Sequence, residues 1–171
     1  QGRDRTTYGE WAMRTRQLGG VLDALEISDY GRVATFSWNT AQHLELYFAA
    51  PCTGRVLHTL NIRLFPEQLT YIVNHADDEV IFVDRSLLPL LAPLLPTFER
   101  LRHLVLIDDG DGDIPDDLSG FELLNYEELL AGSSPIEWKP VDEHRAASMC
   151  YTSGTTGNPE GVVYSHRSTF L

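Results

Sequence analysis

Residues 79–107 read EVIFVDRSLLPLLAPLLPTFERLRHLVLI, and this run predicts the architecture of the chain. Its two ends, Glu79–Val83 and His103–Ile107, are short apolar segments rich in Val and Ile, which is typical of buried strands. The Leu-rich segment Ser86–Leu95 between them predicts a short helix that Ser86 caps. A helix between two fully buried strands indicates that the strands are parallel and that helices cover the sheet.

The same alternation continues on both sides of this run. We expect a helix over 7–26, a strand over Arg32–Ser37, a helix over Ala41–Cys52, a strand over Val56–Leu60, a helix from Pro66, a helix over Tyr126–Ala131 and a strand over Ala147–Thr152. The predicted fold class is therefore α/β, a doubly wound and mainly parallel sheet flanked by helices. Ligands of such sheets bind beyond the carboxyl ends of the strands, so the loop after Thr152 is the expected ligand site.

Composition excludes several classes of protein. The chain has 171 residues, of which 43% are hydrophobic and 22% are charged, as in an ordinary folded domain. Its net charge of −12 argues against binding nucleic acid or anionic lipid through a basic surface. No apolar run is long enough for a transmembrane helix. Two distant cysteines, Cys52 and Cys150, do not form a disulfide framework, which favours a reducing, cytoplasmic location.

The segment 108–128 contains acidic side chains and no basic ones. The spacing of Asp109, Asp111 and Asp113 suggests a calcium loop, but such a loop needs Gly at its sixth position and Glu at its twelfth. Ile114 and Gly120 occupy those positions. We therefore interpret the segment as a solvated, mobile turn.

Six histidines are scattered along the chain without the spacing of a metal site: His43, His58, His75, His103, His144 and His166. We interpret them as core or surface residues. His166 is also a candidate for lining the ligand site, because it follows the expected ligand loop closely.

The expected ligand loop belongs to the motif YTSGTTGNPEGVVYSH, residues 151–166. Its glycines (Gly154, Gly157 and Gly161) permit tight turns and close approach of a ligand, and its hydroxyls (Thr152, Ser153, Thr155 and Thr156) can donate to an anion. The motif is neither a Walker A loop nor a hydrolase nucleophile elbow. Its order, between a strand and a helix-like segment, favours phosphate binding over a flexible linker.

These residues resemble a known family. Residues 151–162 look like the signature loop of the acyl-adenylate-forming (AMP-binding) enzymes, which include acyl-CoA synthetases, luciferases and peptide-synthetase adenylation domains. Further segments resemble the fatty acyl-CoA ligase branch of this family, which comprises long- and medium-chain acyl-CoA synthetases. These segments are residues 163–168 (VYSHRS), 60–64 (LNIRL), 66–69 (PEQL), 81–84 (IFVD) and Thr7-Tyr8-x-Glu10. The resemblance covers nearly the whole chain.

The resemblance implies a two-step ligase. A fatty acid would attack the α-phosphate of ATP to give acyl-AMP and pyrophosphate, and coenzyme A would then displace AMP. Magnesium would neutralise phosphate charge, with Thr152 near the metal. The signature loop would hold the β- and γ-phosphates through Thr152, Ser153, Gly154, Thr155, Thr156, Gly157, Glu160 and Gly161. His166, which follows the loop closely, would be a candidate for facing the acyl channel.

Glu160 departs from the family pattern, which usually has Lys at this position. Lys attracts a triphosphate and Glu repels it, by about 3 kcal/mol per unit charge at about 6 Å and an effective dielectric constant of about 20. Tolerated variation, a substitution, or a lineage that has lost adenylation each fit this difference.

We expect residues 1–171 to be an incomplete N-terminal AMP-binding domain, because later family motifs and the small C-terminal domain are absent. The catalytic residues are expected downstream of residue 171, so this chain alone is expected to be inactive. Two alternatives stay open: an adenylation domain for another acid or for a carrier protein, and a degenerate, non-catalytic relative. A homo-oligomer also stays open, since truncation exposes apolar surface.

Overall fold

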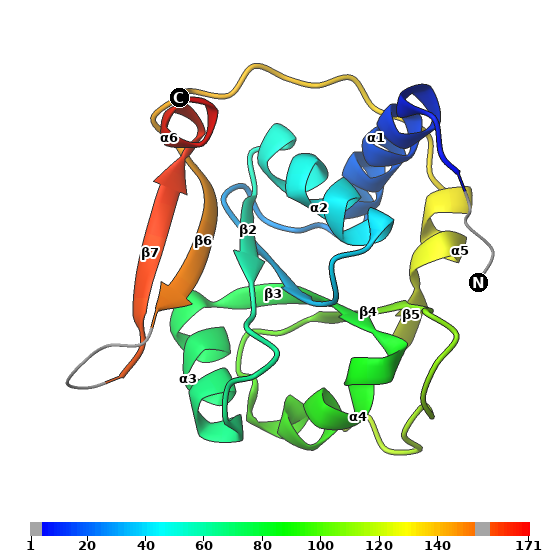
Figure 1. Ribbon diagram of the computed structural model, residues 1–171, viewed down its shortest axis with the longest axis vertical. Coiled ribbons are helices and arrows are strands. Elements are labelled where there is room, and N and C mark those ends of the chain that lie inside the picture. The colour runs from blue at the N-terminus through cyan, green and yellow to red at the C-terminus, as the bar shows by residue number, and fades with distance from the viewer. Residues whose placement is uncertain (1–4, 153–157) are drawn as a thin grey trace.

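A computed structural model describes residues 5–152 and 158–171 of the chain (Figure 1). The elements in order are α1 (Tyr8–Ala24), β1 (Arg32–Phe36), α2 (Ala41–Cys52), β2 (Val56–Thr59), α3 (Pro66–Ala76), β3 (Asp78–Asp84), η1 (Arg85–Leu87), α4 (Leu88–Leu91), η2 (Ala92–Thr97), β4 (His103–Ile107), β5 (Leu123–Asn125), α5 (Tyr126–Ala131), β6 (Ala146–Thr152), β7 (Glu160–Ser165) and α6 (His166–Phe170).

The strands form one sheet in the order β5-β4-β3-β1-β2-β6-β7. Every pair from β5 to β6 is parallel, and only β6 with β7 is antiparallel. The chain passes from β1 to β2 on one side and then crosses to β3 on the other side of β1. The predicted doubly wound, mainly parallel sheet is thus confirmed, and its parallel strands end at the edge where residue 152 lies.

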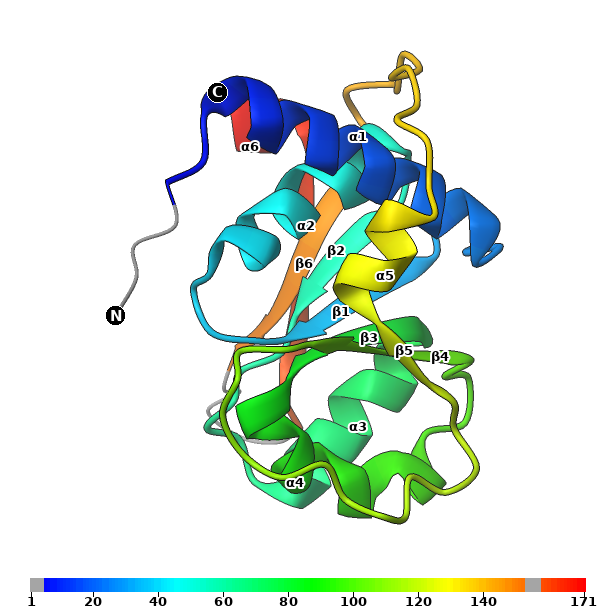
Figure 2. The same cartoon turned by 90° about the vertical axis from the view of Figure 1, so that its right-hand side faces the viewer.

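Two layers of helices cover this sheet (Figure 2). Helices α1, α2 and α5 pack on one face and α3 and α4 on the other, as the two main core clusters show. Strand β3 supplies both cores in alternation, with Val80 and Phe82 in the first and Ile81 and Val83 in the second. Side chains of a strand point to opposite faces in turn, so a continuous apolar run is required for a strand buried on both sides.

Local sequence signals set the helix ends. Thr7 caps α1 in a capping box with Glu10, whose carboxylate accepts from the Thr7 backbone N–H at 2.8 Å. Thr40 caps α2 by accepting from the His43 N–H at 3.2 Å. Pro66 begins α3, where a missing N–H has no cost. After α2 ends, Gly54 has a φ of 78°, a conformation that favours glycine.

The predicted helix over Ser86–Leu95 is wrong in its detail. The structure has a short 3-10 turn, one α-helical turn and a second 3-10 segment. Pro89, Pro93 and Pro96 interrupt the α-helical ladder, because proline has no N–H to donate. Ser86 does not cap a helix; its hydroxyl donates to Asp109 at 2.5 Å and accepts from the Trp38 indole at 3.0 Å.

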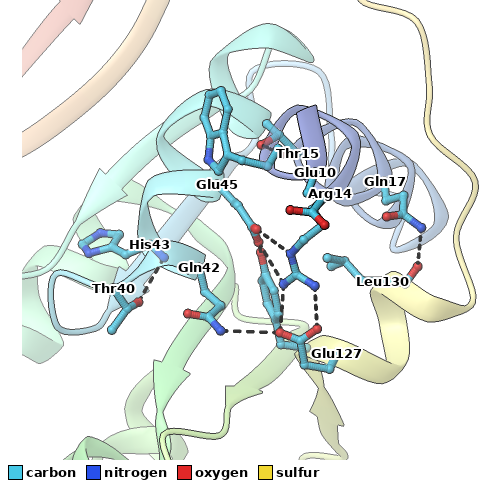
Figure 3. Close-up of polar contacts among 12 residues, drawn as sticks. Glu10, Arg14, Thr15, Gln17, Thr40, Gln42, His43, Glu45, Glu127 and Leu130 are labelled. Atoms are coloured by element: carbon cyan, nitrogen blue, oxygen red, sulfur yellow. Dashed lines mark hydrogen bonds and ion pairs between the residues drawn. The ribbon is translucent and has the colours of Figure 1, made fainter. Parts of the chain in front are cut away.

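A charged network joins the three helices of the first layer (Figure 3). Arg14 of α1 donates to Glu45 of α2 at 2.6 Å and to Glu127 of α5 at 2.8 Å. The buried hydroxyl of Tyr126 donates to Glu45 at 2.5 Å. Glu45 is 2% exposed, so two donors compensate the charge that folding takes out of water.

The remaining sequence predictions concern surface chemistry. Segment 108–128 contains the short strand β5 and the start of α5, and the part of the chain that the structure describes contains no cluster of three His, Cys, Asp or Glu residues that could hold a metal ion. Cys52 and Cys150 are free thiols. Among the described residues, no helix combines the length and the hydropathy needed to span a membrane.

Candidate active site

The candidate site lies at the end of a hairpin. Strand β6 ends at Thr152 and β7 begins at Glu160, and the two residues are direct cross-strand partners. Tyr151 and Gly161 form the next pair. The two stems of the motif therefore lie side by side at the carboxyl end of β6, which runs parallel to β2. This is the edge at which doubly wound sheets bind ligands.

The structure places three of the predicted ligand residues and leaves five untested. Thr152, Glu160 and Gly161 lie on the stems, and all three are exposed. Ser153, Gly154, Thr155, Thr156 and Gly157 lie outside the described residues.

The helix-like segment expected directly after the motif is confirmed as α6, but the strand that precedes this helix was not predicted. Residues 160–165 form β7, and a helix begins only at His166, where Ser165 accepts from the Ser168 N–H at 3.1 Å. The residues Val162, Val163 and Tyr164 explain the strand, because β-branched and aromatic side chains favour extended backbone. Strand β7 makes the motif a hairpin whose two stems are the ends of β6 and β7.

Thr152 and Glu160 define the chemistry of the stems. A hydroxyl and a carboxylate oxygen are hard ligands of the type that Mg²⁺ accepts, and Mg²⁺ is usually held by few protein ligands together with substrate phosphates. The exposed Thr152 hydroxyl fits a metal that arrives with phosphates, whereas the carboxylate of Glu160 across from it would repel those phosphates.

Gly161 lies in close contact with the ring of Tyr151, its cross-strand partner. A Cβ atom at this position would lie 3.3 Å from Cζ of the Tyr151 ring and 3.5 Å from its Oη. The backbone of the second stem thus lies against the side chain of the first. A Cβ at this position would therefore require the Tyr151 ring to shift by a few tenths of an ångström.

Tyr151 is also held by aromatic neighbours on α3. Its hydroxyl lies 2.6 Å from Nδ1 of His75, and the His75 ring stacks on Tyr71 at 5.2 Å between centroids. Partial burial raises the pKa of Tyr151 to about 12, and nearby Asp78 adds to this effect. The tyrosine therefore stays protonated near neutral pH, and its hydroxyl shares with His75 Nδ1 a hydrogen bond whose direction is set by the imidazole tautomer.

A buried pair lies against the other side of this tyrosine. His58 and Asp78 are both fully buried, and His58 Nδ1 is 2.9 Å from each carboxylate oxygen of Asp78. Burial raises the pKa of Asp78, while the His58 partner opposes that shift. The ring of His58 is 5.3 Å from that of Tyr151. Its Nε2 has no hydrogen-bond partner among the described residues.

The comparisons with known proteins agree with this geometry. The sequence model described as "AMP-binding enzyme" matches residues 1–170. The chain belongs to the AMP-binding enzyme family. Among its relatives in that family, 3-methylmercaptopropionyl-CoA ligase of Ruegeria lacuscaerulensis is 46% identical over 168 residues, which cover 98% of this chain and 31% of the relative. Medium-chain-fatty-acid–CoA ligase of Ectopseudomonas oleovorans is 42% identical over 168 residues, 98% of this chain and 30% of the relative.

A solved structure extends the likeness to the fold. The anthranilate CoA ligase AuaEII, in complex with anthranoyl-AMP, superposes with a TM-score of 0.84 at 24% identity, over 96% of this chain and 31% of that one. The chain thus spans about a third of the length of the family members that it matches. Its fold and its membership of the AMP-binding enzyme family are established.

Sequence reasoning found the loop but missed the residues that support its stems. His58 and His75 were interpreted only as core or surface histidines. Their link to Tyr151 spans 76 residues in the case of His75, so no local pattern could signal it. His166 begins α6, where its backbone N–H donates to the Arg145 carbonyl at 3.0 Å, and partial burial lowers the pKa of its ring. Whether it faces an acyl channel stays a prediction.

Proposed function

We propose that this chain is the N-terminal part of an ATP-dependent fatty acid–CoA ligase. The observation that carries the proposal is the hairpin at residues 151–161, at the carboxyl edge of the parallel sheet, in a chain that matches the AMP-binding family over residues 1–170. The reaction would join a fatty acid to AMP with release of pyrophosphate, and then transfer the acyl group to coenzyme A.

The loop would bind the phosphates of ATP through its hydroxyls and backbone N–H groups. We assign this role to Thr152 and to Ser153, Gly154, Thr155, Thr156 and Gly157, with Gly161 closing the second stem. Magnesium, when bound, would neutralise phosphate charge beside Thr152. Glu160 would lie next to these phosphates because it is the cross-strand partner of Thr152.

The chain is proposed to supply only part of the active site. Family members of about three times its length carry the complete activity that their names state, so residues 1–171 would form an incomplete AMP-binding domain. Catalytic groups would come from beyond residue 171. The 171-residue chain alone is therefore expected to form no AMP when supplied with ATP and a fatty acid.

The fatty acid is the finer part of the proposal. The resemblance of residues 60–69 and 163–168 to the fatty acyl-CoA ligase branch supports it, whereas the names of the relatives cover several acids. Another acid, or a carrier protein in place of coenzyme A, is the alternative. We propose the cytoplasm as the compartment, since both cysteines are free thiols.

The test is the formation of acyl-CoA by the longer protein that contains this chain. Fatty acids of several chain lengths and 3-methylmercaptopropionate would be offered separately with ATP, Mg²⁺ and coenzyme A. A thioester that forms only with all components, and fastest with a fatty acid, is expected. Fastest turnover of 3-methylmercaptopropionate would overturn the substrate assignment, and acyl-AMP without a thioester would favour a carrier protein.

A further inference from the structure

The side chain of Tyr151 contacts both stems of the candidate loop. Tyr151 directly precedes Thr152 on β6, and its ring lies so close to Gly161 on β7 that an added Cβ would approach to 3.3 Å. Any displacement of this ring therefore moves the first stem, the second stem or both.

Two histidines from different elements fix that ring. Nδ1 of His75 on α3 is hydrogen-bonded to the tyrosine hydroxyl at 2.6 Å, and the His75 ring is itself stacked on Tyr71, one helical turn earlier. His58 of β2 lies against the ring at 5.3 Å and cannot move easily, since it is fully buried and bonded to Asp78. A tyrosine with its ring packed and its hydroxyl bonded has one orientation available.

The proposed mechanism does not use this cluster for chemistry. The carboxylate of Asp78 and the imidazole of His58 are bonded to each other, and the imidazole of His75 is bonded to Tyr151. Tyr151 is partly buried, whereas Thr152 beyond it is exposed to a ligand. The cluster therefore acts through the backbone of the stems.

We propose that Tyr151 and His75 are positioning residues for ATP: their hydrogen bond, supported by the buried His58–Asp78 pair, holds the two stems of the phosphate-binding loop at a fixed separation. The expected effect on ATP affinity rests on the proposed function. The anchoring itself can be measured without any activity.

Three variants remove or restore the bond. Tyr151→Phe keeps the ring and loses the hydroxyl, His75→Leu loses the hydrogen-bond partner of that hydroxyl, and His75→Gln offers a side-chain amide as a new partner. Asn74→Ala is the matched control on the same helix. Asn74 donates to the Thr97 carbonyl at 2.8 Å and accepts from the Glu99 N–H at 2.9 Å, so the control loses two hydrogen bonds without touching the stems.

The first measurement is amide hydrogen exchange of residues 146–152 and 160–165 in the 171-residue chain. Exchange in these segments should accelerate roughly fivefold in Tyr151→Phe and His75→Leu, as loss of one hydrogen bond gives. His75→Gln should restore most of the protection, and Asn74→Ala should leave it unchanged. Equal protection in all variants, or equal loss in Asn74→Ala, would overturn the inference.

The second measurement is pyrophosphate exchange by the longer protein. Tyr151→Phe and His75→Leu should raise KM for ATP roughly fivefold while KM for the fatty acid stays constant, and His75→Gln should recover most of the ATP affinity. A change confined to the fatty acid, or none, would overturn the positioning role. If the unaltered protein shows no exchange at all, the proposed function fails, and hydrogen exchange still decides whether the bond anchors the stems.

Discussion

Replacement of Arg14 by Met should lower the free energy of unfolding far more than loss of the exposed contact between Arg14 and Glu127. Arg14 is the cation of the network in Figure 3, between buried Glu45 and half-exposed Glu127. Removal of the guanidinium leaves the Glu45 charge with the Tyr126 hydroxyl as its partner. Stranding a buried charge costs roughly 3–5 kcal/mol, and we expect about 3 kcal/mol because the Tyr126 bond remains.

Glu127 supplies the matched control, since the same arginine bonds both carboxylates. The Glu127 side chain is 53% exposed, against 2% for Glu45. Water screens the exposed pair, so Glu127→Gln should cost at most about 1 kcal/mol. Hydrogen bonds from Arg14 lower the pKa of Glu127, which means that the pair is intact near neutral pH.

The assay is urea unfolding of the 171-residue chain at pH 7, followed by far-UV circular dichroism. Each free energy of unfolding is extrapolated to water, with m-values compared to confirm that the same surface unfolds. The double variant Arg14→Met/Glu45→Gln should recover about 2 kcal/mol of the loss, because Gln still accepts from Tyr126 without a charge. A cost below about 1 kcal/mol for Arg14→Met, or no recovery in the double variant, would refute the reasoning.

Three further predictions concern single residues. Burial lowers the pKa of His43, so the stabilising effect of its neutral ring is complete above the unfolded pKa of about 6.5 and is lost as pH falls through the folded pKa. The free energy of unfolding, measured by urea titration, should therefore rise from pH 5 to pH 7. In His43→Gln this rise should be smaller by up to about 1 kcal/mol. Glu160→Lys should lower KM for ATP in the longer protein at least tenfold, with Glu160→Gln between the two; an unchanged KM would remove this side chain from the phosphates. Gly161→Ala should cost about 1 kcal/mol more than Gly132→Ala, whose nearest contact is 3.5 Å away, and equal thermal stability would show that the Tyr151 ring has room.

The parallel part of the fold could be predicted because its signals are local. A strand buried on both faces must be apolar throughout, so Glu79–Val83 predicted a strand that the structure extends to Asp78–Asp84. Helix caps such as Thr7 and Thr40 are also local signals, because the side-chain hydroxyl of each accepts from a backbone N–H in the first turn of its own helix. Strand β5 was missed because three residues among acidic neighbours do not form a periodic pattern.

The candidate site could be predicted only in part. The loop is contiguous in the sequence, which is why its residues could be named before the structure. The hairpin was not expected, because the pairing of Thr152 with Glu160 depends on β7 reversing direction at the sheet edge. The contacts of His75 and His58 with Tyr151 form only when α3 and β2 pack beside β6. A pattern read along the sequence cannot indicate such contacts between distant residues.

The most direct test of the central claim is fatty-acid-dependent exchange of pyrophosphate into ATP by the longer protein that carries Glu160. Exchange that requires both Mg²⁺ and a fatty acid, and that is lost in Thr152→Ala, is the result expected of an acyl-adenylate-forming ligase. No exchange with any acid, from a protein whose unfolding is cooperative and whose Glu160→Lys variant is also inactive, would contradict the account.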